Sequence, residues 1–318
     1  MLLKDKFLAL VAIFIAVFLL ETQAVAVDSK PKVLPAPWQY LADRLVREKV
    51  WDAAMEELLF MLPAKPTQSP MGRKMRDLYK KQFFPRPKIK PTDYYKGVVT
   101  KDNAEKCAAY VKMHRQAFAA AQQKYAVPPE IAVALLFVET RLGKVLADIP
   151  EDAFYTLASM AVSREPKDIS SWLPKMPGVN KRLKWVAKTM VGRAEWAYKE
   201  FKALIIYMVA NRIYPKDLPG SIYGAVGLCQ FMPSNISIYG ADGNHDGRID
   251  LFNIDDAAMS LAKYLAKHGW REGIDRDTQH ALLMKYNHSK VYANTILALS
   301  DLIVLERGNG EQPDVSPR

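Results

Sequence analysis

The sequence has only two cysteines, Cys107 and Cys229, in 318 residues. A framework of several disulfides is therefore excluded, and the two thiols either form one bridge or stay as small buried apolar side chains. Strand signals are few and no internal repeat occurs, which indicates a mainly α-helical chain. The net charge of +11 favours an acidic partner. Nucleic acid is the least favoured one, because no arginine-rich helix or aromatic-interleaved basic strand is present.

The N-terminus has the pattern of a secretory signal peptide. Lys4 and Lys6 precede fourteen apolar residues at 7–20, and the Ala-Val-Ala sequence at 24–26 offers a small-x-small cleavage site. The apolar run is too short for a comfortable membrane span. No cysteine follows it, so a lipid anchor is not expected. We predict removal of residues 1–26 and a monomer in the periplasm, with membrane association only if the segment stays uncleaved.

The rest of the chain divides into three predicted regions. Residues 27–102 form an N-terminal helical region, residues 103–305 a larger helical domain, and residues 306–318 a disordered tail. Within the domain, the pattern predicts one long helix over about 103–125 and an irregular loop over 163–178.

The stretch "PPEIAVALLFVETRLG" reads as a buried helix that ends beside a carboxylate. Residues 131–138 are apolar on every side, Pro128 marks the start of the helix and Gly143 its end. Glu139 therefore lies in the last turn, next to apolar packing. Its carboxyl group must be paired, open to a cleft or kept partly neutral by desolvation, unless the helix simply emerges into water there.

Three further stretches are informative. In "GSIYGAVGLCQFMPSN" the glycines permit close backbone approach. The stretch has no phosphate-binding pattern, and taken alone it is better explained as a structural turn. In "YNHSKVYANTILALSDLIVL", Tyr292 fits a buried tyrosine whose hydroxyl has a partner. In "DGNHDGRIDLFN", Asp242, Asn244 and Asp246 match the first half of an EF-hand loop. The expected glutamate at position twelve is Asn253.

Together these motifs resemble the B-type lytic murein transglycosylases. That family has a GVET-like helix end, an AGAMGxxQFMPS loop, a DxDGDGxxDLWN block and a YNxS segment. Here they stand as "FVETRLG", "YGAVGLCQFMPS", "DGNHDGRIDLFN" and "YNHS", in the same order. The resemblance covers roughly residues 104–305. It departs from the family at Val226, at Phe252, and in the short segment of fifteen residues at 271–285.

The resemblance implies a mainly α-helical, lysozyme-like catalytic domain with extra N-terminal helices and an EF-hand-like loop. It also implies cleavage of the β-1,4 bond between N-acetylmuramic acid and N-acetylglucosamine in peptidoglycan glycan strands, leaving 1,6-anhydromuramyl ends. Glu139 is the implied acid and base, and no cofactor serves catalysis. The implied substrate-binding residues are Ser221, Gln230, Tyr264, Tyr286, Asn287 and Tyr292.

The resemblance also implies a structural calcium ion. In the family the acidic loop closes with a later aspartate, which here is Asp256, and Arg248 would contribute its backbone carbonyl. The alternative is a turn rich in Asp, Asn and Gly that binds no ion.

Two rival functions stay open at this stage. A muramidase would need a second catalytic carboxylate, such as Asp148 or Glu151. In the second alternative, a non-catalytic, calcium-binding wall protein, the cleft residues would be retained from a catalytic ancestor without a catalytic role. The residues that argue against this second alternative by their joint presence are Glu139, Ser221, Gln230 and Asn287.

Overall fold

The computed structural model describes residues 33–85, 92–146, 150–219 and 221–310. The predicted signal segment lies outside these ranges. From Pro35 onward the chain forms one unit of packed helices. Its described part contains no strand, only an isolated bridge between Val226 and Phe231. The prediction of a mainly α-helical chain is confirmed. Within the same ranges, no helix is long and apolar enough to cross a membrane.

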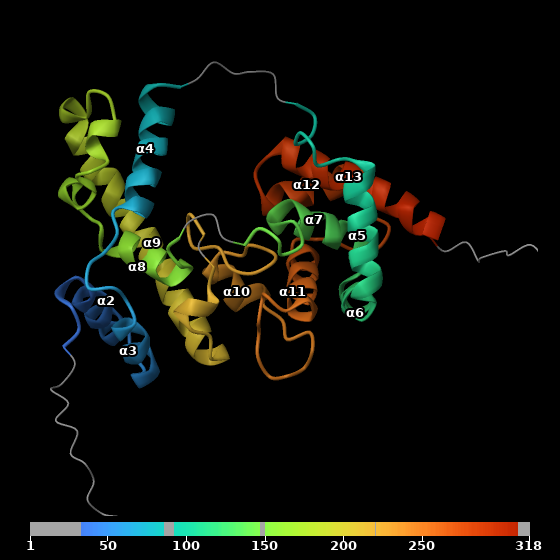
Figure 1. Ribbon diagram of the computed structural model, residues 1–318, viewed down its shortest axis with the longest axis horizontal. Helices are drawn as coiled ribbons and strands as arrows, with labels where there is room; N and C mark the ends of the chain where they lie inside the picture. Colours follow the sequence, from blue (N-terminus) through green and yellow to red (C-terminus); the bar gives the residue numbers. More distant parts are fainter. Residues whose placement is uncertain (1–32, 86–91, 147–149, 220, 311–318) are drawn as a thin grey trace, which may run out of the picture. The chain divides into compact units, whose positions relative to one another are not determined.

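The N-terminal helices α2, α3 and α4 pack against α8 and α9 (Figure 1). Trp38, Leu41 and Leu45 recur at helical spacing along α2, and all three are fully buried. The apolar stripe of α2 thus anchors the N-terminal helices to the core of the unit. These helices span Ala36–Arg47 (α2), Ala53–Phe60 (α3), Ser69–Phe83 (α4), Ala153–Val162 (α8) and Leu183–Asn211 (α9).

A second group of helices surrounds α7, which contacts α5, α6, α11 and α13. Residues 131–137 are all buried, so the prediction of a core helix is confirmed. Helix α10 connects the groups through contacts with α9 and α11. The bounds are Lys101–Met113 (α5), Arg115–Tyr125 (α6), Pro129–Thr140 (α7), Pro233–Tyr239 (α10), Ile254–Lys267 (α11), Arg276–Tyr286 (α12) and Lys290–Gly310 (α13).

The single helix predicted over 103–125 is wrong, because the chain breaks at His114, where ψ is 34°. Helix α5 packs on α13 while α6 packs on α11. Val111 of α5 and Phe118 of α6, on either side of the break, are both buried.

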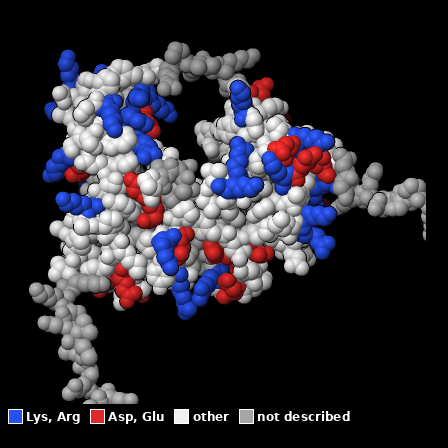
Figure 2. All heavy atoms as spheres, in the orientation of Figure 1, with Lys and Arg blue, Asp and Glu red and all other residues white. Residues whose placement is uncertain are grey.

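The loop predicted over 163–178 contains two short 3₁₀ helices, η1 (Pro166–Ile169) and η2 (Leu173–Lys175), and η3 (Val179–Arg182) follows it. Helix α13 also continues to Gly310, past the predicted start of the tail at 306. Arg307 forms an ion pair with Glu130 of α7, which holds that last turn in place. On the face drawn in Figure 2, Lys and Arg side chains gather over α4.

Candidate active site

Glu139 lies in the last turn of α7, and the backbone beyond it cannot continue the helix. Arg141, Leu142 and Gly143 have φ angles of 52°, 58° and 85°. Three successive left-handed residues end a right-handed helix. A Cβ atom on Gly143 would lie 2.9 Å from the side chain of Leu228. Glycine at this position therefore lets the helix end approach the loop that contains Leu228.

That loop, residues 221–230, is fixed to the end of α7 by hydrogen bonds. Thr140 Oγ1 donates to the carbonyl of Leu228 at 3.1 Å, and the amide of Leu228 donates to the carbonyl of Leu251 at 2.8 Å. A Cβ atom on Gly227 would lie 2.3 Å from Leu251 Cβ. The glycine is thus required for the close approach of the loop to the chain at Leu251.

The carboxyl group of Glu139 meets the hydroxyl of Tyr292, a residue of α13. Tyr292 Oη donates to Glu139 Oε1 at 2.5 Å. Burial raises the pKa of Glu139 to about 7, while the hydrogen bond from Tyr292 acts in the opposite direction. Burial, together with the nearby Glu139 charge, holds the pKa of Tyr292 well above its usual range. Tyr292 therefore stays a donor, and Glu139 changes protonation near neutral pH.

Aromatic rings from three helices gather beside this pair. The rings of Tyr286 and Tyr292 are parallel within 7°, with centroids 6.2 Å apart. Tyr264 meets Tyr286 edge-on at 4.9 Å and stacks on His268 at 4.1 Å. Tyr286 Oη donates to the backbone carbonyl of Cys229, which joins α12 to the glycine-rich loop. The structure thus places the three predicted tyrosines in one cluster, and Tyr292 is the member that contacts Glu139.

The predicted polar residues are arranged differently. Ser221 is buried, and its Oγ accepts from the amide of Ala225 at 3.0 Å. Gln230 has a φ of 50°, and its Nε2 donates to the carbonyl of Gly227 at 2.9 Å. Both side chains thus bond within the loop itself. Asn287 is the C-cap residue of α12 through its backbone N–H, and its side chain is exposed.

Sequence reasoning missed several contributors to this site. His268 follows Tyr264 by one helical turn, a spacing that predicts contact on one helix face. Thr140 is adjacent to Glu139, but its bond to the loop depends on a contact 88 residues away. Cys229 contributes its backbone carbonyl, and a backbone contact cannot be predicted from the residue type. Its thiol is buried and free, as is that of Cys107, so the two cysteines are unpaired.

The acidic loop contains the predicted metal-binding residues but ties their side chains to its own amides. Asp242 and Asn244 side chains both accept from the amide of Asp246, at 3.2 and 3.0 Å. The carboxylate of Asp246 accepts from the amide of Arg248 at 2.9 Å. Across the described residues, no group of three His, Cys, Asp or Glu side chains is arranged to hold a metal ion.

Asp256 is fully buried beneath this loop. Its Oδ1 accepts from the amide of Gly243 at 2.7 Å, and its Oδ2 from that of Asp250 at 2.6 Å. Asp256 Oδ1 also accepts from the amide of Asn244 at 3.4 Å. Carboxylate and amide oxygens are nevertheless the hard donors that calcium prefers. The oxygen donors of the loop are thus of the type that binds calcium. In this structure the same oxygens accept hydrogen bonds from the amides of the loop, as in a turn that binds no ion.

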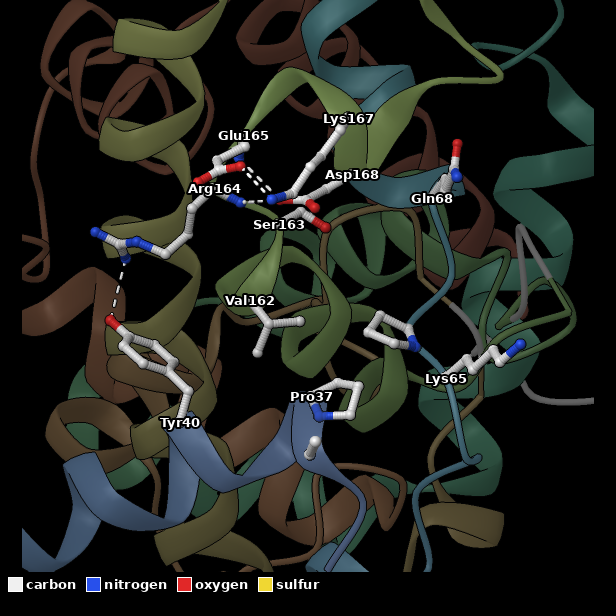
Figure 3. A pocket seen from close by; sticks show the side chains of 12 residues that line it. Pro37, Tyr40, Lys65, Gln68, Val162, Ser163, Arg164, Glu165, Lys167 and Asp168 are labelled. Carbon is white, nitrogen blue, oxygen red and sulfur yellow. Dashed lines mark hydrogen bonds and ion pairs between the residues drawn. The ribbon is translucent and has the colours of Figure 1, made fainter.

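A cavity of about 660 Å³ lies elsewhere, between α2 and the junction of α8 with η1 (Figure 3). Arg164 crosses it to Tyr40, with 3.1 Å between Nη1 and Oη. None of the predicted site residues is among the described residues that line it. We therefore place the candidate active site at Glu139, on geometry rather than on cavity size.

Comparison with known proteins finds relatives by sequence and by structure. The family model of the transglycosylase SLT domain matches residues 36–279. The membrane-bound lytic murein transglycosylase B of Escherichia coli (strain K12) is 32% identical over 181 residues, which is 57% of this chain. The match spans only 42% of that relative's length.

Solved structures share the fold. The Escherichia coli lytic transglycosylase SLT35, solved with calcium, matches with a TM-score of 0.60 and 22% identity, covering 86% of this chain and 94% of that one. SltB1 of Pseudomonas aeruginosa matches with a TM-score of 0.61 and 18% identity, covering 86% and 100%. SltB3 of the same organism, solved with a NAG-NAM-pentapeptide, gives 0.60 and 17%, covering 88% and 82%. The predicted lysozyme-like helical fold is confirmed.

Proposed function

The chain belongs to the transglycosylase SLT domain family, and from this premise we propose that it is a lytic transglycosylase that cleaves peptidoglycan glycan strands. The bond cleaved is the β-1,4 link between N-acetylmuramic acid and N-acetylglucosamine. The product is a 1,6-anhydromuramyl end, formed without the addition of water.

One observation carries the proposal: the carboxyl group of the half-buried Glu139 receives a hydrogen bond from Tyr292, and desolvation raises its pKa to about 7. A carboxyl group with this pKa is partly neutral at the working pH. It can therefore donate a proton and later accept one. Among the described groups that shift its pKa there is no second carboxylate.

In the proposed reaction, neutral Glu139 gives its proton to the glycosidic oxygen as the bond to the muramyl C1 breaks. The carboxylate that remains then takes the proton of the muramyl 6-hydroxyl, whose oxygen attacks C1 and closes the anhydro ring. The substrate's N-acetyl group supports C1 between the two steps, as the resemblance implies. Tyr292 keeps the carboxyl group in position throughout.

The substrate contacts proposed for the other residues follow from their placement. Tyr264 and Tyr292 are buried, so their proposed role is to support the site from beneath. Tyr286 is partly exposed, and its ring is proposed to offer an apolar face to the sugar. Asn287 offers an exposed amide. Ser221 and Gln230 shape the loop that forms the adjacent wall, and their remaining polar atoms are the ones proposed to meet the glycan.

We also propose a periplasmic location after removal of residues 1–26, and a monomeric enzyme. A structural calcium ion would be held by the side chains of Asp242, Asn244, Asp246 and Asp256 and by the carbonyl of Arg248. It would stabilise the turn that leads into α11. It takes no part in the reaction.

The test is the product of glycan-strand digestion together with Glu139→Gln. Wild-type digests should give anhydromuramyl ends by mass spectrometry, and Glu139→Gln should lower the cleavage rate by about 10² to 10⁴. Glu130→Gln, in the first turn of the same helix, is the matched control and should cleave normally.

Reducing ends in the wild-type digest would mean that water is the nucleophile. A muramidase mechanism with a second carboxylate would then replace this one. Of the two candidates, Asp148 lies outside the described residues, and Glu151 Oε1 is 3.5 Å from Thr67 Oγ1. Normal cleavage by Glu139→Gln would refute the proposed mechanism.

A further inference from the structure

Almost all of the chain's excess positive charge lies on two segments. Helix α4 carries five Lys or Arg and one acid, Asp77, and residues 169–194 carry six Lys or Arg and no acid. Together they account for a net +10, against +11 for the whole chain. The cations are Arg73, Lys74, Arg76, Lys80, Lys81, Lys175, Lys181, Arg182, Lys184, Lys188 and Arg193.

The two segments form one surface, here called the basic face. Helix α4 packs against η1 and α9. Tyr79 Oη donates to the carbonyl of Pro177 at 2.7 Å and accepts from Arg182 Nη1 at 2.9 Å. Arg76 and Lys175 lie over the ring of Trp172, at 5.3 and 4.2 Å from its centroid. In Figure 2 the Lys and Arg side chains over α4 have few acidic ones among them.

Most cations of the basic face have no acidic side chain that neutralises their charge. Of its eleven cations, only Arg76 forms an ion pair with another described residue, to Asp77 at 3.3 Å. Burial, and next the charge of Arg193, lower the pKa of Lys74. Lys80, Lys81, Lys184 and Lys188 are exposed. Unpaired cations on one surface create a positive field that attracts an anionic partner.

The basic face reaches the proposed cleft. The ammonium group of Lys74 lies 4.0 Å from the ring centroid of Tyr223, in the glycine-rich loop. Tyr223 stands two residues after Ser221, one of the proposed substrate contacts. A polymer that occupies the cleft beside that loop would therefore continue onto α4.

We propose that the basic face binds the carboxylates of the peptides carried by the glycan strand, where the strand extends beyond the cleft. Each free peptide end carries a carboxylate, so a strand with several peptides presents a row of anions to a row of cations. This inference rests on the proposed function. Phe84 and Leu183 are exposed beside the cations. Apolar side chains next to cations would also suit binding to an anionic lipid surface. The junction with the cleft loop favours the polymer.

The experiment reverses charges on exposed side chains of the basic face: Lys80→Glu, Lys81→Glu, Lys184→Glu and Lys188→Glu in one protein. The matched control reverses the same number elsewhere: Lys49→Glu, Lys112→Glu, Lys199→Glu and Lys216→Glu. Both are compared with the wild type for cleavage of peptide-bearing glycan strands and of strands stripped of peptides. Circular dichroism and Tm report folding.

At low salt, the basic-face variant should cleave peptide-bearing strands at least about tenfold more slowly than the control. It should cleave stripped strands equally well. The difference should shrink as salt rises toward physiological levels and beyond, because salt screens exposed charges. An equal effect on both substrates, or none on either, overturns the inference.

Two further outcomes separate this inference from other failures. If the wild type cleaves neither substrate, the proposed function fails, and co-sedimentation of each variant with peptide-bearing and stripped strands still tests the basic face. If the reversals abolish binding to phosphatidylglycerol vesicles but leave peptide-bearing strands unaffected, the surface binds lipid and the inference is wrong.

Discussion

Tyr292 donates a hydrogen bond to Glu139 across 153 residues of sequence, at 2.5 Å. The bond favours the charged carboxylate, whereas burial favours the neutral acid, and burial has the larger effect on the pKa of Glu139. The result is a carboxyl group that titrates near neutral pH. The same tyrosine positions the carboxyl group and limits how far its pKa rises.

Tyr292→Phe should therefore move the pH dependence of cleavage. Without the donor, the charged form of Glu139 loses a stabilising contact, and its pKa rises above about 7. The alkaline limb of the kcat/KM profile, where the acid loses its proton, should shift to higher pH. The maximal rate should fall, because the carboxyl group is less well held. A pH–rate profile between pH 5 and 9 measures both effects.

Tyr286→Phe is the matched control for this shift. Its hydroxyl donates to the carbonyl of Cys229, not to Glu139. The substitution should lower stability or rate while leaving the alkaline limb in place. An equal shift in both variants would mean that the Tyr292 hydroxyl has no specific effect on Glu139.

Glu139→Gln should change the pH dependence of stability in a definite direction. Burial raises the pKa of Glu139 to about 7 in the folded protein, whereas the ordinary pKa of a glutamate carboxyl group is 4.5. The folded state therefore holds a proton that the unfolded state releases between these values, and stability falls as pH rises through this window. The full penalty, about 3 kcal/mol at 1.36 kcal/mol per unit, is present above pH 7.

Glutamine removes this penalty while still accepting a bond from Tyr292. The Tm of Glu139→Gln should exceed that of the wild type by a few degrees at pH 8 and equal it at pH 4. Thermal unfolding at both values is the measurement. A gain at pH 4 as large as that at pH 8 would assign the effect to packing instead of ionisation.

The sequence was sufficient to predict the part of this site that lies within one helix. An apolar run on all sides, bounded by Pro128 and Gly143, predicts a buried helix with Glu139 in its last turn. The break at His114 could not be predicted in the same way. It depends on α5 and α6 packing against different helices, and neither Gly nor Pro marks the position.

The polar side chains of the site were harder to predict for a physical reason. Motif positions identify Ser221 and Gln230, but not the partner of each polar atom. Both side chains bond within their own loop, and this follows from a turn geometry that includes a left-handed Gln230. Similarly, the spacing of Asp242 and Asp246 matches a metal loop, although the same spacing serves a turn closed by its own amides.

Gln230 allows the structural and substrate roles of the loop to be separated. Gln230→Gly removes the side-chain bond to Gly227, about 1 kcal/mol, and relieves the left-handed backbone at φ 50°. Stability should stay close to that of the wild type. Gln230→Ala loses the bond without that relief and should be less stable. If both variants lose the same share of the wild-type turnover although their Tm values differ, the Gln230 side-chain amide contacts substrate. If the loss of turnover instead parallels the loss of Tm, Gln230 has a structural role alone.

Calcium should raise the Tm of the wild type, because an ion that binds only the folded loop stabilises it by mass action. The oxygens of Asp242, Asn244 and Asp246 would have to turn from the loop amides to the ion, so the site should respond at micromolar to millimolar calcium, the range of weaker loops. Asp246→Ala should abolish the shift while cleavage continues, since the ion is outside the proposed reaction.

Asp277→Ala, an exposed acid in α12, is the control and should keep the full shift. Differential scanning fluorimetry over a calcium series, with magnesium in parallel, measures this. A wild-type Tm unchanged at millimolar calcium would make the loop a turn held by its own hydrogen bonds, with Asp256 serving only as their buried acceptor.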